Sequence, residues 1–84
     1  MRYSLQIKES AFKELQRIAK PDRIRIIDAI DNLPANPWAG KSLKGEMAGL
    51  RRIRVGNYRV VYEIIDQEVL ILVVRVAHRR QVYR

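Results

Sequence analysis

The pattern of polar and apolar residues in the first part of the chain predicts one strand and two helices. Residues 2–8 alternate strictly between polar and apolar, which is the period of a strand with one face on a core. Apolar residues then recur at helical spacing over residues 12–19, and Ser10 is placed to cap that helix. A second helical stripe runs from Pro21, which fits a first helical turn, to Pro34, which ends the helix.

The middle of the chain, residues 33–49, is predicted to be a loop because proline and glycine interrupt it repeatedly. Trp38 is the one tryptophan of the chain and lies within this loop. Because the large apolar area of a tryptophan gains most from burial, we expect Trp38 to anchor the loop on the core. The alternative is a platform on which a nucleic-acid base stacks.

Three strands are predicted in the rest of the chain, over residues 50–55, 58–65 and 69–77. Gly56 and Asn57 form a pair typical of a tight hairpin with positive φ at the glycine. The order β-α-α-β-β-β predicts an α+β fold, an antiparallel meander sheet with a helix hairpin packed on one face and the other face open.

The hairpin register places arginines from two strands on one face. If the loop has only two residues, Arg54 lies opposite Arg59, and Arg52 projects from the same side. The opposite side is the core side and carries Ile53, Val55, Tyr58 and Val60. Like charges directly opposite each other destabilise a sheet, so we expect an anion between Arg54 and Arg59. The alternative is a solvated strand face on which long side chains avoid each other.

The length of 84 residues predicts a single domain, 1–84. The chain has no cysteine, which leaves neither a disulfide framework nor a thiolate metal site. No apolar run is long enough to span a bilayer, and the N-terminus has no signal-peptide core. We therefore expect a soluble, cytoplasmic protein with no membrane partner.

The charge is strongly positive and unevenly distributed. The chain has a net charge of +8, and residues 41–84 carry 10 basic and 4 acidic side chains, whereas residues 1–40 carry 7 and 5. A basic excess concentrated in one half favours a polyanionic partner, nucleic acid or an acidic protein, over a merely solvated basic surface.

The C-terminal residues add side chains used in catalysis, His78, Arg79 and Tyr83. Each alone is most often a surface residue or a packing anchor. Together with the arginine face they form a set without carboxylates, which suits phosphodiester cleavage without a metal. No cluster of His, Asp or Glu is spaced for a metal, so we expect neither metal nor cofactor.

Three segments carry a resemblance to a known family: residues 43–45 ahead of 50–54, then 58–62, and 76–83. With them the chain resembles the RelE/ParE superfamily of toxin–antitoxin toxins, and the RelE branch in particular. The resemblance implies a microbial-ribonuclease-like fold and ribosome-dependent cleavage of mRNA in the A site, close to ribosomal RNA. It also implies that a cognate acidic antitoxin neutralises the toxin, and that the toxin contacts operator DNA only through this antitoxin.

The resemblance also assigns roles to residues. Arg59 and Arg79 match two phosphate-contacting arginines, and Tyr83 matches a C-terminal tyrosine. Arg52 and Arg54 stand where the best-known RelE toxins have lysines. Because arginine stays protonated at all relevant pH values, we expect these two residues to bind charge rather than accept a proton.

The expected reaction is attack of an RNA 2′-hydroxyl on the adjacent phosphate, leaving a cyclic phosphate. Its candidate catalytic residues are Arg52, Arg54, Arg59, His78, Arg79 and Tyr83. Further RNA contacts are expected from Lys44, Arg51 and Arg80. Histidine is the residue type whose ordinary pKa suits proton transfer near neutrality, which makes His78 the candidate acid or base.

Two other functions fit the same fold. The first is a ParE-like toxin that inhibits DNA gyrase without cutting nucleic acid, and the second is an inactive module that only binds an antitoxin. His78, Arg79 and Tyr83 argue against the ParE-like function, because an inhibitor that does not cleave has no need of them.

Overall fold

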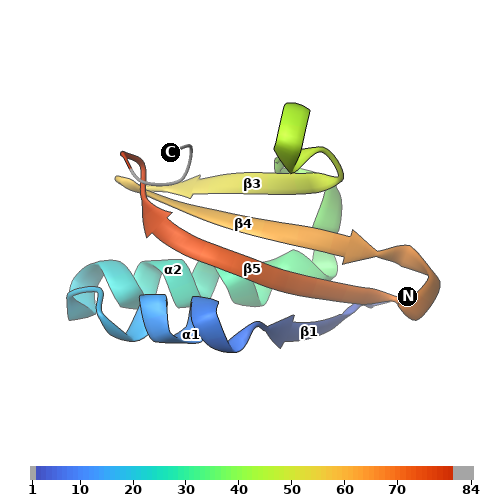
Figure 1. The fold of residues 1–84 in the computed structure, drawn as a ribbon. Coiled ribbons are helices and arrows are strands. Elements are labelled where there is room, and N and C mark those ends of the chain that lie inside the picture. Colours follow the sequence, from blue (N-terminus) through green and yellow to red (C-terminus); the bar gives the residue numbers. More distant parts are fainter. Residues whose placement is uncertain (1, 81–84) are drawn as a thin grey trace.

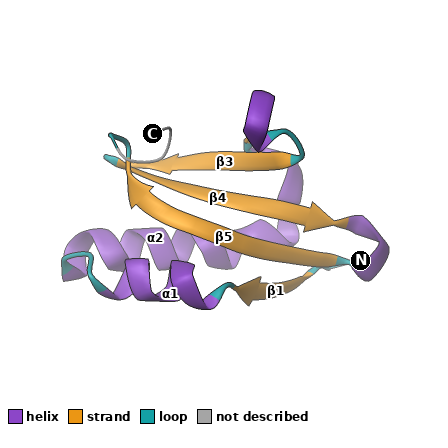
Figure 2. Cartoon of the chain, viewed as in Figure 1, coloured by secondary structure: helices purple, strands orange, loops and turns teal. Residues whose placement is uncertain are grey.

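The computed structural model describes residues 2–80, which form a five-stranded sheet with two helices on one face (Figure 1 and Figure 2). The strand order is β1-β5-β4-β3-β2. The helices and strands are β1 Ser4–Ile7, α1 Glu9–Gln16, α2 Lys20–Asn32, β2 Lys41–Ser42, β3 Leu50–Val55, β4 Tyr58–Ile65 and β5 Leu70–His78. None of the helices in this part of the chain has the length and apolar character needed to cross a membrane.

The predicted α+β fold is confirmed, and the structure adds the position of the first strand. β1 pairs in parallel with β5, with Ser4 beside Leu70 and Ile7 beside Val73. β5 therefore lies between two strands, which accounts for its apolar character over most of its length. The remaining pairs of strands are antiparallel.

The prediction that Ser10 caps the first helix is wrong. The helix begins at Glu9, so Ser10 lies inside it, and the capping position belongs to Lys8, whose side chain makes no capping hydrogen bond. The backbone N–H of Lys8 instead donates to the carbonyl of Val73 at 2.9 Å. The sheet thus holds the chain extended up to Lys8, and the helix starts at the next residue.

The predicted loop over residues 33–49 contains the short edge strand β2 and three single turns of 3-10 helix, Leu33–Ala35, Pro37–Ala39 and Gly45–Met47. The expectation that Trp38 anchors this loop is wrong, because 59% of its surface is exposed. Tyr62, buried in β4, holds the loop instead. Its hydroxyl donates to the carbonyl of Pro37 at 2.7 Å and accepts from the N–H of Gly40 at 3.0 Å.

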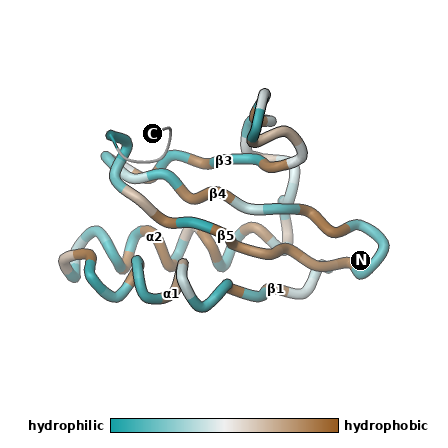
Figure 3. Tube along the Cα trace, in the orientation of Figure 1, coloured by the Kyte–Doolittle hydropathy of each residue, from teal (hydrophilic) through white to brown (hydrophobic). Residues whose placement is uncertain are grey.

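The main core lies between the helix pair and the covered face of the sheet. Its buried residues are Ala11, Leu15, Ile18, Ile26, Ile30, Leu33, Val60, Tyr62, Ile71, Val73 and Val76. The other face is open only in part, because Leu43 and Met47 pack there against Val61 and Ala77. Hydrophilic residues prevail near the end of the sheet where β3 turns into β4 and β5 ends, whereas the first half of β5 is hydrophobic (Figure 3).

Candidate anion-binding site

The predicted hairpin register is confirmed. Arg54 pairs with Arg59 and Arg52 with Val61, so Arg52, Arg54 and Arg59 project from the open face. Gly56 has a φ of 60°, while Asn57 is not among the described residues with positive φ. This is the pattern of a type II′ turn, whose twist matches that of the two strands and so fixes their pairing.

A small hollow lies at this end of the sheet. It has a volume of about 100 Å³ and is lined by Arg54, Gly56, Tyr58, Arg59 and Arg79. Three guanidinium groups thus come from three segments, β3, β4 and the residues after β5. Within residues 2–80, no carboxylate lines the hollow. Its size and charge suit a phosphate group, because the arginine fork matches phosphate oxygens.

Arg79 is held at the hollow by backbone contacts. Its N–H donates to the carbonyl of Asn57 at 2.8 Å, and its own carbonyl accepts from Nη1 of Arg59 at 3.3 Å. The chain leaving β5 is therefore tied to the β3–β4 turn. These contacts bring Arg79 close to Arg54 and Arg59, although Arg79 lies 20 residues or more beyond them in the sequence.

A second hollow lies beside the first. It has a volume of about 350 Å³ and is lined by Ala39, Lys41, Arg52, Ile53 and Arg54. Arg52 and Arg54 therefore join the site as predicted from the register. Lys41 was missed in the sequence, because a strand of two residues shows no periodicity.

His78, grouped with the arginines as a catalytic candidate, does not lie beside them. Ala77 is the residue that pairs with Arg59, so the next side chain, His78, projects from the covered face and pairs with Tyr58. The two rings meet edge to face at 5.5 Å between centroids. His78 lines a different hollow, of about 560 Å³, between α1 and β5.

Tyr58 is the residue that connects the two sides. It lines the small hollow with the arginines and also the 560 Å³ hollow with His78. The sequence pattern assigned Tyr58 to the core face alone, because alternation does not show that a long side chain at a strand end reaches past the edge of the core.

Arg51 also lies apart from the arginine face. Its guanidinium donates to the carbonyls of Trp38, at 3.2 Å, and Gly40, and to Oγ of Ser42 at 3.0 Å. It also stacks over the Trp38 ring at 5.2 Å from the ring centroid. These contacts hold the loop before β2 on the edge of the sheet, and they engage both Nη atoms of Arg51.

The other predicted site residues are not brought into either arginine-lined hollow. Lys44 and Arg80 are exposed, and neither lines the two hollows. The N–H of Arg80 donates to Nδ1 of His78 at 3.3 Å. Tyr83 lies outside the described residues.

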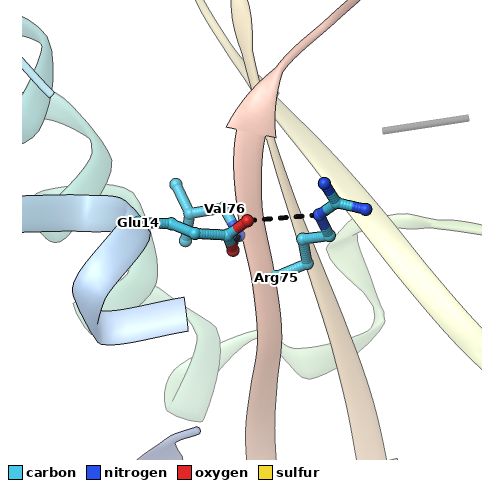
Figure 4. A network of polar contacts seen from close by, with 3 residues as sticks. All are labelled: Glu14, Arg75 and Val76. Atoms are coloured by element: carbon cyan, nitrogen blue, oxygen red, sulfur yellow. Dashed lines mark hydrogen bonds and ion pairs between the residues drawn. The ribbon is translucent and has the colours of Figure 1, made fainter. Parts of the chain in front are cut away.

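A carboxylate supports β5 just before it reaches the site (Figure 4). Oε1 of Glu14, on α1, accepts from the N–H of Val76 at 2.9 Å, and Oε2 lies 3.3 Å from Nε of Arg75. β1 pairs with β5 only as far as Val73. Beyond the end of β1, the Glu14 carboxylate thus accepts a backbone hydrogen bond from β5, and α1 holds the last part of β5 in place.

Comparisons with known proteins agree with one another. The family model described as the ParE toxin of the type II toxin–antitoxin system parDE matches residues 5–83. Toxin RelG of Mycobacterium tuberculosis is 30% identical over 86 residues, covering 100% of this chain and 99% of that protein. Toxin RelE of the same organism is 32% identical over 84 residues, covering 98% and 87%.

The fold gives the same answer as the sequence. A chain in the crystal structure of the toxin–antitoxin complex RelBE2 from Mycobacterium tuberculosis matches with a TM-score of 0.87. That match has 27% sequence identity and covers 94% of this chain and 100% of the other. The chain therefore belongs to the RelE/ParE superfamily of type II toxins.

Proposed function

We propose that this toxin is an endoribonuclease that cuts mRNA in the ribosomal A site without a metal ion. The observation that carries the proposal is the small hollow in which Arg54, Arg59 and Arg79 converge, with no carboxylate among the described residues of its lining. Three cations around a space of phosphate size suit a reaction in which negative charge builds up on phosphorus. The relatives named RelE and RelG support the same branch of the superfamily.

The proposed reaction is a transfer within the RNA chain. The 2′-oxygen forms a bond to the adjacent phosphorus, the bond from phosphorus to the 5′-oxygen breaks, and the product ends in a cyclic phosphate. A proton leaves the 2′-hydroxyl, and the departing 5′-oxygen takes one up. Arg54, Arg59 and Arg79 stabilise the charge on the phosphorane, and Arg52 binds the RNA backbone beside them.

The arginines do not carry the protons, because guanidinium groups stay protonated. We propose Tyr83, from its match to the family, as the residue that orients or stacks on the base. His78 contacts Tyr58 rather than the small hollow, so we propose it as a positioning residue that holds Tyr58 at the rim. Lys44 and Arg80, both exposed, are the proposed contacts to ribosomal RNA.

We also propose a cognate acidic antitoxin as the partner that silences the toxin. A relative of the same fold was crystallised as a toxin–antitoxin complex. The helices of this chain expose the large apolar side chains Phe12, Ile24 and Ile27, and we propose that the antitoxin covers them. An amphipathic antitoxin helix can cover them, while an acidic segment elsewhere in the antitoxin meets the basic face on the other side of the sheet.

The proposal is tested with programmed ribosomes. Purified toxin is mixed with ribosomes that hold a defined mRNA, and cuts are located by primer extension. We expect one cut in the A-site codon, a 2′,3′-cyclic phosphate on the upstream fragment, and no cut when the nucleotide 5′ of the scissile bond lacks its 2′-hydroxyl. Intact mRNA under all conditions refutes the ribonuclease proposal.

The second candidate is inhibition of DNA gyrase, and the description of the matching family as a ParE toxin favours it. A supercoiling assay separates the two functions. Inhibition of gyrase together with intact mRNA on the ribosome favours the ParE-like function, and cut mRNA with normal supercoiling excludes it.

A further inference from the structure

The pairing of β2 with β3 is short and leaves part of β3 with an open edge. β2 pairs only through Lys41 with Arg52 and through Ser42 with Arg51. The rest of β3, residues 53–55, has β4 on one side, and no strand of residues 2–80 pairs with it on the other. The 350 Å³ hollow includes Ile53 and Arg54 of this open edge, so it continues the sheet where β2 has ended.

Lys41 extends the basic face by one strand. Because Lys41 pairs with Arg52, the two side chains project from the same face of the sheet, with Cβ atoms about 4.5–5.5 Å apart. Arg54 follows Arg52 by two residues on β3 and pairs with Arg59. The cations therefore continue across neighbouring strands, from the hollow at Arg79 to the edge of the sheet at Lys41.

The two hollows lined by arginine, of about 100 Å³ and about 350 Å³, differ in a way that suits consecutive parts of one RNA strand. The small one, about 100 Å³, is lined mainly by guanidinium groups. The larger one, about 350 Å³, also has the apolar residues Ala39 and Ile53 in its lining, and its volume lies in the range of sites for small organic molecules. Apolar walls favour a base, and the surrounding cations favour its phosphate.

We propose that the 350 Å³ hollow beside Lys41 is a subsite for a nucleotide next to the scissile bond, and that Lys41 binds the phosphate of that nucleotide. Single-stranded RNA then crosses the strands of the sheet rather than following them. This inference rests on the proposed function in one respect, that the substrate is RNA.

An acidic peptide that adds a strand to the open edge is the competing occupant. The open edge of β3 is short, since it is bounded by β2 at Arg52 and by the turn at Gly56. Three residues lie at the lower limit of strand lengths, where typical strands have five or six. The edge therefore offers a peptide few backbone hydrogen bonds, whereas a nucleotide needs only the space and the charge.

The test measures binding of RNA that cannot be cut. Fluorescence anisotropy gives the affinity of the full chain for a dinucleotide and a hexanucleotide of 2′-O-methyl uridine at several salt concentrations. We expect Lys41→Gln to lower the slope of log affinity against log salt by about 0.7 for the hexanucleotide, the value for one contact to a single strand. The dinucleotide has one internucleotide phosphate, which the small hollow takes, so its slope stays unchanged.

Lys20→Gln is the matched control, because it removes the same charge from α2, on the opposite side of the sheet. Equal slopes for Lys41→Gln and Lys20→Gln overturn the subsite. So does an equal loss for both oligonucleotides. A hexaglutamate peptide is measured in parallel, and a loss of its affinity as large as that of the hexanucleotide shows a surface that selects charge alone, which also overturns the proposal.

The blocked RNA keeps this test separate from the test of the proposed function. If wild type leaves mRNA intact on the ribosome but Lys41→Gln shows the length-dependent loss, the subsite is supported and the cleavage proposal fails. If wild type cuts mRNA and Lys41→Gln behaves like Lys20→Gln, only the subsite fails.

Discussion

Arg54 lies directly opposite Arg59 in the β3–β4 hairpin, on the open face of the sheet. Two like charges at this separation destabilise a strand pair by a few tenths of a kcal/mol up to about 1 kcal/mol. Both side chains line the small hollow. The repulsion within this pair therefore disfavours the strand pairing, and we expect an anion bound between the two guanidinium groups to offset it.

Arg54→Gln is expected to make the free toxin more stable while weakening its site. Relief of about 0.5 kcal/mol of repulsion raises the midpoint of thermal unfolding by roughly 2–4 °C in a domain of this size. Added phosphate then stabilises wild type more than the variant, because a ligand stabilises the folded state that binds it. Calorimetry with and without phosphate checks both points, and a variant less stable than wild type in phosphate-free buffer contradicts them.

Gly40→Ala is expected to disrupt the loop that leads into β2. A Cβ at this position comes within 2.5 Å of the carbonyl oxygen of Arg52 and 2.6 Å of the Tyr62 hydroxyl, so the backbone has to move. We expect a loss of about 1–3 kcal/mol in the free energy of unfolding, the usual cost of overpacking. Urea denaturation measures it.

Tyr62→Phe tests the same contact without adding an atom. It leaves the N–H of Gly40 and the carbonyl of Pro37 without their buried partner, at a cost of about 1–3 kcal/mol. Stabilities equal to wild type for both variants mean that Tyr62 does not hold this loop.

Glu14→Ala is expected to destabilise the last part of β5 by about 1–3 kcal/mol, because the N–H of Val76 loses its acceptor in a partly buried position. Glu14→Gln keeps an acceptor oxygen and is expected to cost less. Glu9→Ala is the control, since it removes an exposed ion pair with Lys13 on the same helix, a contact worth about 0.3–0.5 kcal/mol. Chemical denaturation that ranks Glu9→Ala above Glu14→Ala in cost contradicts this account.

Tyr3 gives the stability a dependence on alkaline pH. Its hydroxyl donates a hydrogen bond to the carboxylate of Asp66, which raises the pKa of Tyr3 above the ordinary value of about 10. The folded state thus keeps the phenol protonated after the unfolded chain has begun to lose the proton. The stabilisation is fully present below pH 10 and is lost as the pH rises through the pKa of the folded state.

Tyr3→Phe removes this contribution. We expect the difference in unfolding free energy between wild type and Tyr3→Phe to stay constant from pH 8 to about pH 10 and to shrink at higher pH. A difference that grows as the pH rises above 10 excludes the hydrogen bond to Asp66 as its cause.

The arginine face could be predicted from the sequence because a two-residue turn determines which residues pair. Once Gly56 and Asn57 form the turn, alternation assigns Arg52, Arg54 and Arg59 to one side. The same reasoning could not place His78. The register between β4 and β5 shifts between Val61 and Tyr62, and a shift of one residue reverses the face of every side chain that follows.

The edge of the site could not be predicted for a different reason. β2 has two residues, Lys41 and Ser42, and both are polar, so no periodic pattern marks it as a strand. The prediction that Trp38 anchors the loop is wrong because burial of the ring is only a tendency of the residue type. In this fold Arg51 stacks on the ring and the buried Tyr62 holds the loop, so the loop is anchored without burying the tryptophan.

Two adjacent arginines provide the most direct test of the proposed mechanism. Arg79 lines the small hollow, whereas its neighbour Arg80 does not, and both are exposed. The measurement is the single-turnover rate of mRNA cleavage on programmed ribosomes for Arg79→Ala and Arg80→Ala. We expect Arg79→Ala to lower the rate by about 10²–10³, the loss seen when one charge-stabilising donor is removed, and Arg80→Ala to lower it far less. Equal rates for the two variants contradict the assignment of the hollow as the site of phosphate chemistry.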